Sequence, residues 1–537
     1  MYESPVIQLS KVTTTKVDGL GSLTALTICD DTFKDKCHRY TGIRFAKPPI
    51  GPLRWRRPQP LPEDYDYSGD YSSFKTICPQ PFYNNRGGKP NPEFKYDEDC
   101  LFLNIWVPAG KPPSGGWPVL YFIHGGWLQV GNPLHYRQCD PQDLQAEDSL
   151  EKFILVSPGY RLNLFGFLSC QELLDEDKGN SNFGFWDQRL GLEWVYKNIG
   201  KLGGDKNNIT VGGVSAGSYS SIFQVAYEMY HPEVTQIIKK ALLLSNGLAI
   251  QPKTISECEE QFDEVVEMFG INPDLSGEDK LTALRDIPFQ ALAEKILDLK
   301  LHTFRAVTDN DMVSSTLFKD ILDGTFGEKV RDSGRSFIIG EVINEHAVYA
   351  NTNPPKSTED LFNQINNYYP KSVAKALLKL YPDVPQTDDE EKHLANLKFL
   401  YGRIISDVQV YASSRVLVNS LVKGGVPSDK INRYQIAFRG KFFDKYEPPE
   451  MLVPHAGDMG IWFYNYVDGI LPEEKPYYLS WLKPYCKWLS EGQMDWGTTD
   501  PLRMRTFNPD GSITIEDDLK WDWGMTVGQT IATAVGL

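Results

Sequence analysis

Short apolar segments bounded by Gly, Pro or Asn recur along the chain. They are apolar almost throughout, which is typical of strands covered on both faces. These segments span 101–107, 119–123, 153–157, 209–212, 241–245, 336–340 and 434–438. Stretches with the apolar repeat of amphipathic helices lie between them, at 187–199, 256–269, 357–368 and 371–380. Strands that alternate with helices predict an α/β fold, in which helices cover both faces of a large, mostly parallel sheet.

The same pattern predicts one large domain with helical insertions. Although 537 residues could form several domains, no Ser-, Gln- or charge-rich linker divides the chain, and no internal repeat is visible. The mostly helical region 256–325 is expected to be an insertion over the sheet. We therefore predict a single domain over residues 1–537.

Charge and hydropathy exclude several classes of partner. The net charge of −16 argues against binding to nucleic acid or to anionic membranes. No apolar stretch is long enough to span a membrane, and the first residues lack the features of a signal peptide. This predicts a cytoplasmic or otherwise intracellular protein, or a secreted one whose signal has been removed.

The eight cysteines lack zinc-site spacing and are too few for a disulfide scaffold, so we expect no metal.

The most informative local pattern is Gly213-Val214-Ser215-Ala216-Gly217. It lies between the apolar run 209–212 and a predicted helix over 218–229, so the serine stands at a sharp turn from strand to helix. The two glycines remove side chains from that turn, which leaves the serine oxygen accessible. The free N–H groups at the start of the helix can stabilise an anion that forms beside the serine. Ser215 is thus a candidate nucleophile.

A serine nucleophile needs a histidine base, and the histidine needs a carboxylate that fixes its tautomer. His455 lies in a loop-like stretch after the strand 434–438, and Glu345 follows the strand 336–340. Glu341 and His346 are close rivals in sequence, and each residue could also be an ordinary loop side chain. The order Ser215, Glu345, His455 is nevertheless the one expected for a triad on such a sheet.

A second group of anion-stabilising donors is predicted after the strand 119–123. The sequence His124-Gly125-Gly126-Trp127 follows this strand directly. A Gly pair at such a point allows backbone N–H groups to turn toward a tetrahedral oxyanion. A plain β-turn is the alternative.

Several longer sequence motifs follow one another along the chain. They are Gly42 to Trp55, Glu98 to Ile105, Tyr160 to Asn163, Asn182 to Gln188 and Gly203 to Gly217. With these motifs the chain resembles the type-B carboxylesterase/lipase family, the α/β-hydrolases that include the cholinesterases, from about residue 41 to 465. The resemblance implies an α/β-hydrolase fold that requires no cofactor.

The resemblance also assigns roles to single residues. It makes Ser215 the nucleophile, Glu345 the acid and His455 the base. The oxyanion donors would be the backbone N–H groups of Gly126, Trp127 and Ala216. The family disulfide falls on Cys78 and Cys100, and structural ion pairs fall on Arg54 with Glu98 and on Arg161 with Asp187.

Some positions depart from the family pattern. Val214 replaces the usual Glu before the nucleophile, Trp127 occupies a position often held by Gly or Ala, and His346 replaces the Gly after the acid. No second short disulfide is expected at Cys258. Cys29 and Cys37 could pair or could be free thiols.

The predicted reaction is hydrolysis of a small-molecule carboxylic ester through an acyl-enzyme. Three alternatives use the same triad, namely lactone opening, thioester cleavage and acyl transfer in a biosynthetic pathway. A non-catalytic binding protein is less consistent with three suitable triad residues. The loop that contains Arg86-Gly87-Gly88 is the first candidate for a lid.

Overall fold

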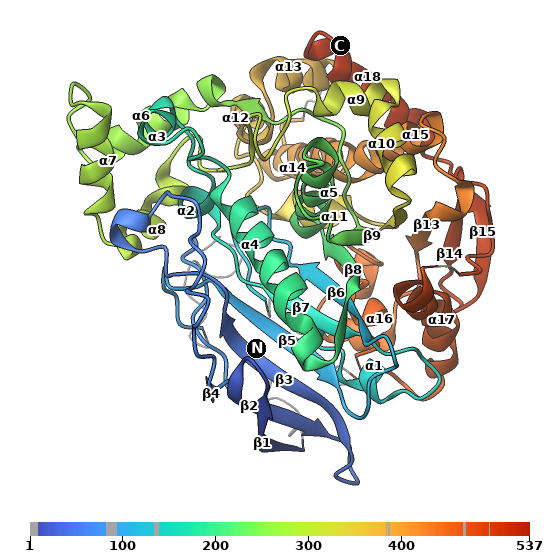
Figure 1. The fold of residues 1–537 in the computed structure, drawn as a ribbon. Helices are drawn as coiled ribbons and strands as arrows, with labels where there is room; N and C mark the ends of the chain where they lie inside the picture. Colours follow the sequence, from blue (N-terminus) through green and yellow to red (C-terminus); the bar gives the residue numbers. More distant parts are fainter. Residues whose placement is uncertain are drawn as a thin grey trace.

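The computed structural model describes residues 9–81, 94–133, 139–382, 384, 387–465, 469–492 and 494–537 (Figure 1). The candidate lid residues 86–88 lie outside this described part. In the described part, no helix is both long enough and apolar enough to cross a membrane.

The centre of the fold is a sheet that contains thirteen strands in the described part of the chain. Its order is β1-β2-β3-β5-β7-β6-β8-β9-β12-β13-β14-β15, with β4 beside β2. The first half comprises β1 (Ser10–Val17), β2 (Gly21–Cys29), β3 (Asp35–Arg44), β4 (Gly69–Asp70), β5 (Phe102–Pro108), β6 (Trp117–Ile123) and β7 (Ile154–Pro158). The second half comprises β8 (Gly204–Val214), β9 (Ile238–Leu244), β12 (Ser336–Val342), β13 (Ile431–Ile436), β14 (Arg503–Phe507) and β15 (Ile513–Asp517).

The strands from β7 to β14 in this order run parallel to one another, whereas β7 pairs antiparallel with β5 and β14 pairs antiparallel with β15. The parallel centre predicted from the apolar runs is therefore present. Because parallel strands end at the same edge of the sheet, the loops after β6, β8, β12 and β13 gather there.

Helices cover both faces of this sheet, as predicted (Figure 1). They are α1 (Gln142–Ala146), α2 (Asn163–Phe167), α3 (Gln171–Glu176), α4 (Phe183–Asn198), α5 (Ala216–Tyr230), α6 (Glu259–Met268), α7 (Gly277–Arg285), α8 (Phe289–Lys295) and α9 (Leu317–Asp323). The later helices are α10 (Thr325–Ser333), α11 (His346–Asn351), α12 (Thr358–Tyr368), α13 (Lys371–Leu380), α14 (Glu390–Ser406), α15 (Ser413–Lys423), α16 (Met459–Trp462), α17 (Lys475–Glu491) and α18 (Trp521–Ala534).

Side chains alternate between two apolar cores because the strand period is two. In β9, Ala241 and Leu243 join the core beneath α4 and α5, whereas Leu242 and Leu244 join the core beneath α16 and α17. Strands buried on both faces explain why the sequence shows continuous apolar runs in place of alternation.

The predicted helical insertion is also present. The segment 256–325 contains α6, α7, α8 and α9, and it includes the short strand β11 (Val307–Thr308), which pairs with β10 (Lys253–Thr254). Figure 1 shows α6 to α8 projecting at one end of the molecule.

Candidate active site

Ser215 occupies the predicted turn between β8 and α5. Its φ of 59° and ψ of −123° lie outside the regions that L-residues usually adopt, so the backbone is strained there. A Cβ atom at Gly217 would lie 1.9 Å from the Ile123 carbonyl oxygen, and one at Gly213 would lie 2.4 Å from the Gly217 carbonyl carbon. Close backbone packing therefore requires both glycines, and the strand–turn–helix prediction is confirmed.

The segment after β6 forms a tight turn beside this elbow. Gly126 and Trp127 both have positive φ, of 108° and 60°. A side chain at Gly126 would collide with the Val130 carbonyl oxygen at 1.9 Å. The near contact of Gly217 with Ile123 places the start of α5 against this turn. The Ala216 N–H, which has no acceptor within its own helix, thus lies next to the turn that carries Gly126 and Trp127.

Glu345 and His455 meet although 110 residues separate them in the sequence. His455 Nδ1 lies 2.5 Å from Glu345 Oε2, and both side chains are buried. The other carboxylate oxygen of Glu345 accepts a hydrogen bond from the Val342 N–H at 2.9 Å. Asn344 connects the two loops, because its N–H donates to Val453 and its side-chain amide donates to Met451.

The rival residues have other partners. Arg415 donates to Glu341 at 2.7 Å within a buried ion-pair network that also contains Asp518. The His346 ring packs against Phe399, with ring centroids 5.2 Å apart. Glu341 and His346 therefore have partners other than Glu345 and His455.

Tyr349 is a site residue that the sequence analysis missed. Its hydroxyl oxygen lies 3.3 Å from His455 Nε2, and the two rings lie 4.8 Å apart. Burial raises the pKa of Tyr349 well above its usual value, the charge of Glu345 adds to this, and a hydrogen bond with Ser215 opposes it. The tyrosine hydroxyl thus contacts His455 and lies near Ser215. The available signal was spacing, since Tyr349 follows Glu345 by one helical turn.

Two other titratable residues, His124 and Asp458, lie near the candidate site. Burial lowers the pKa of His124 to about 4, so its ring is neutral at pH 7. The ring stacks on that of Tyr160. Burial raises the pKa of Asp458 to about 7, and the nearby Glu345 charge adds to this increase. The Trp462 indole N–H opposes the increase by donating to the Asp458 carboxylate at 2.8 Å.

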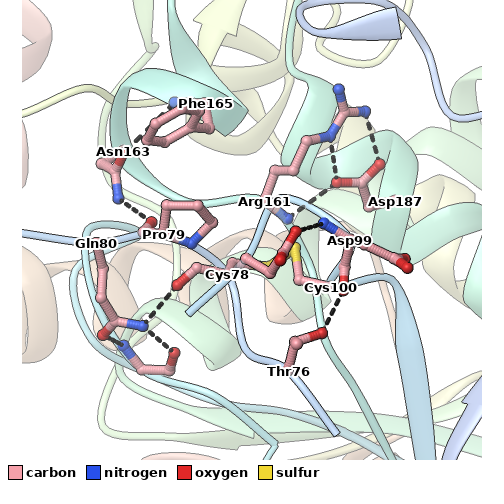
Figure 2. Close-up of a disulfide and its surroundings, with 12 residues drawn as sticks. Thr76, Cys78, Pro79, Gln80, Asp99, Cys100, Arg161, Asn163, Phe165 and Asp187 are labelled. Carbon is pink, nitrogen blue, oxygen red and sulfur yellow. Dashed lines mark hydrogen bonds and ion pairs between the residues drawn. A yellow bond between two sulfur atoms is a disulfide. The ribbon is translucent and has the colours of Figure 1, made fainter. Parts of the chain in front are cut away.

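The predicted disulfide joins Cys78 to Cys100 (Figure 2). The two residues after Cys78 are linked to the turn after β6, Gln80 directly and Pro79 through Asn163. The Gln80 side chain exchanges two hydrogen bonds with the Gly131 backbone, at 2.8 and 3.0 Å. The Asn163 amide donates to the carbonyls of both Pro79 and Gln129, each at 3.0 Å. The disulfide therefore anchors a segment that supports the turn after β6.

Both predicted ion pairs are present and buried. Arg54 contacts Glu98 through two short hydrogen bonds, at 2.6 and 2.7 Å. Arg161 contacts Asp187 in the same bidentate way, at 2.7 and 2.8 Å (Figure 2). Because neither pair touches Ser215 or His455 in the described contacts, we regard them as structural.

The departures from the family pattern have clear local consequences. Val214 is fully buried in the apolar core, so no charge stands there. The Trp127 ring meets the Tyr349 ring edge-on, with ring centroids 6.3 Å apart, so the tryptophan of the turn after β6 packs against the tyrosine beside His455. Cys29, Cys37 and Cys258 are free thiols, so Cys29 and Cys37 do not pair.

Comparison with known proteins identifies the family. The model of the carboxylesterase family matches residues 12–475. The chain belongs to the carboxylesterase family. It is 68% identical to an uncharacterized esterase/lipase of Schizosaccharomyces pombe over the full length of both chains. It is 34% identical to a carboxylic ester hydrolase of Gibberella moniliformis over 94% of each chain, and 28% identical to an acetylcholinesterase of Bungarus fasciatus over 78% of this chain and 68% of that enzyme.

The resemblance inferred from the sequence motifs is thereby confirmed, and so is the assignment to a family of ester hydrolases. The α/β-hydrolase fold implied by that family agrees with the largely parallel sheet and the helices around it.

Proposed function

We propose that this protein hydrolyses small carboxylic esters through an acyl-enzyme, with Ser215 as nucleophile, His455 as base and Glu345 as the carboxylate that orients the base. The observation that carries the proposal is the 2.5 Å contact between His455 Nδ1 and Glu345 Oε2, at the edge of the sheet where Ser215 stands on its turn. We further propose that residues 1–537 act as a single domain.

In this mechanism His455 Nε2 accepts the proton of Ser215 while the serine oxygen attacks the ester carbonyl. The backbone N–H groups of Gly126, Trp127 and Ala216 stabilise the oxyanion of the tetrahedral intermediate. His455 then protonates the leaving alcohol. Water repeats the sequence on the acyl-enzyme and releases the acid. Ionised Glu345 favours the imidazolium that forms in both halves of the cycle.

The test is the Ser215→Ala variant, assayed with a 4-nitrophenyl ester and with a fluorophosphonate probe. We expect turnover to fall to the background rate and covalent labelling to disappear. Ser218→Ala is a matched control, because Ser218 lies in the first turn of the helix that follows Ser215 and its hydroxyl donates to the Asn246 carbonyl. Near-normal turnover or labelling in folded Ser215→Ala protein would refute the proposal.

A further inference from the structure

A cavity near Ser215 carries two positive charges without a carboxylate among its described lining residues. Lys253 and Arg305 both line it. The other described lining residues are neutral, and they are mainly tyrosine, amide and apolar side chains. Because the whole chain has a net charge of −16, a cavity lined by two cations and by no described carboxylate differs in charge from the rest of the molecule.

Arg305 is held by aromatic rings and not by an ion pair. Its guanidinium carbon lies 5.3 Å from the ring centroid of Tyr219 and 5.3 Å from that of Tyr368. These cation–π contacts fix the guanidinium plane. Arg305 Nη1 is buried and has no hydrogen-bond partner in the described part of the chain. A ligand oxygen that accepted a hydrogen bond from Nη1 would offset the cost of burying this donor.

Lys253 adds the second charge. Its ammonium donates to the Asn366 carbonyl at 2.7 Å, and an ammonium can make two more hydrogen bonds. Burial lowers the pKa of Lys253, and the nearby Arg305 charge adds to this decrease, against the opposing effects of Cys258, Glu257 and Glu260. The two cations are therefore close enough to repel one another, and an anion between them would relieve the repulsion.

One wall residue of the cavity lies one helical turn from the proposed nucleophile. Tyr219, which forms part of its wall, follows Ser215 by one turn of α5, and its N–H donates to the Ser215 carbonyl at 3.0 Å. Tyr368 and Tyr369 also line the cavity, and both raise the pKa of Tyr349, whose hydroxyl reaches His455 Nε2. The tyrosines of the cavity wall thus lie near both the proposed nucleophile and Tyr349.

We infer that Arg305 and Lys253 bind a carboxylate of the substrate, so that this enzyme prefers esters that carry a second, ionised carboxyl group, such as half-esters of dicarboxylic acids. The planar guanidinium matches a carboxylate in geometry, and the ammonium supplies a second charge-assisted hydrogen bond. The inference rests on the proposed esterase function.

The first test compares two substrates with equal numbers of acyl carbons, the 4-nitrophenyl half-ester of glutaric acid and 4-nitrophenyl pentanoate, after subtraction of uncatalysed hydrolysis. We expect kcat/KM to be higher for the half-ester. Arg305→Gln and Lys253→Gln should each reduce that preference about tenfold, the loss of one hydrogen bond to a charged group, and leave the pentanoate rate within about twofold.

Lys371→Gln is the matched control, because Lys371 follows the lining residue Pro370 but is exposed and paired with Glu260. It should leave the preference unchanged. The inference is overturned if the wild-type protein does not prefer the half-ester, or if the preference survives in both Arg305→Gln and Lys253→Gln. Two variants are used so that misfolding of one does not decide the result.

A second measurement separates this inference from the esterase proposal. Glutarate should raise the melting temperature of the Ser215→Ala variant, and a Ser215→Ala/Arg305→Gln variant should lose this effect. Binding that depends on Arg305 supports the carboxylate site even if the esterase proposal fails. Binding without a half-ester preference in an active enzyme would show that the carboxylate belongs to a separate ligand, which overturns the assignment to the substrate.

Discussion

The Tyr349 hydroxyl lies 3.3 Å from His455 Nε2, the ring nitrogen that the proposed mechanism assigns as the base of Ser215. Tyr349 is itself buried, and its ring packs against the imidazole. In the proposed mechanism the hydroxyl therefore competes with Ser215 for this nitrogen, and substrate binding must shift the balance toward the serine.

Replacing Tyr349 with Phe removes the competing hydroxyl and keeps the ring. We expect the second-order rate of serine phosphonylation to rise about fivefold, which corresponds to one hydrogen bond worth ~1 kcal/mol. The rate of labelling by a fluorophosphonate measures this directly. Tyr369→Phe is a suitable control, since Tyr369 is a neighbouring buried tyrosine that makes no hydrogen bond with His455 in the described part of the chain. A labelling rate reduced tenfold in Tyr349→Phe would mean that the hydroxyl assists attack.

Glu345→Gln should test the role of the carboxylate. The variant keeps the size of the side chain but removes the charge, and its amide N–H can impose the wrong tautomer on His455. We expect kcat for a 4-nitrophenyl ester to fall ~1,000-fold or more, as in other triads that lose their acid. Glu345→Asp, which retains the charge, should recover part of this activity. Unchanged kcat in Glu345→Gln would exclude Glu345 from the mechanism.

Sequence patterns predicted the central strands because those strands are buried on both faces. The strands at the two edges of the sheet were not predicted. The strand β1 has mostly exposed side chains, and β15 has no buried residue, so neither shows a continuous apolar run. The antiparallel edge strands therefore lack the signal that reveals β8 or β9.

The same limit applies to the site. Ser215 and its glycines could be found from sequence because close backbone contacts within a short segment demand them. The family resemblance was needed to select Glu345 over Glu341, because Glu341 lies at the end of β12 and Glu345 follows the same strand closely. The contact of Tyr349 with His455, and the proximity of Arg305 to Lys253, depend on how distant loops pack. No local spacing encodes such packing.

Asp458 should make stability depend on pH. Its pKa is raised to about 7 in the folded protein, against 3.8 for the ordinary group, so the folded state holds this proton more tightly. The contribution of Asp458 to the free energy of unfolding is then complete below about pH 4 and is lost as the pH rises toward 7. Asp458→Asn removes this dependence and keeps an oxygen that can accept from Trp462.

We expect the stability of Asp458→Asn relative to the wild type to increase by about 3 kcal/mol between pH 4.5 and 7.5. Urea unfolding at several pH values measures it. Asp388→Asn, at an exposed position before α14, should show no such trend. A constant difference between wild type and Asp458→Asn across this range would contradict a buried, protonated Asp458.

Removal of the disulfide should affect both stability and catalysis. The bond closes a loop with a sequence separation of 22 residues, and cross-links of this size are worth about 3 kcal/mol. Its loss also loosens Pro79 and Gln80, which support the turn that carries the proposed oxyanion donors. A Cys78→Ala/Cys100→Ala variant should therefore melt at a lower temperature, and its kcat should fall more than its KM rises, because the donors act on the transition state.

The matched control is Cys29→Ala/Cys37→Ala, which also removes two buried sulfurs but breaks no covalent bond. Its melting temperature should decrease less, and its kcat should stay near that of the wild type. Steady-state kinetics well below the melting temperature of each variant separate the catalytic effect from unfolding. If both double variants lost kcat equally, the Cys78–Cys100 bond would stabilise the fold without positioning the oxyanion turn.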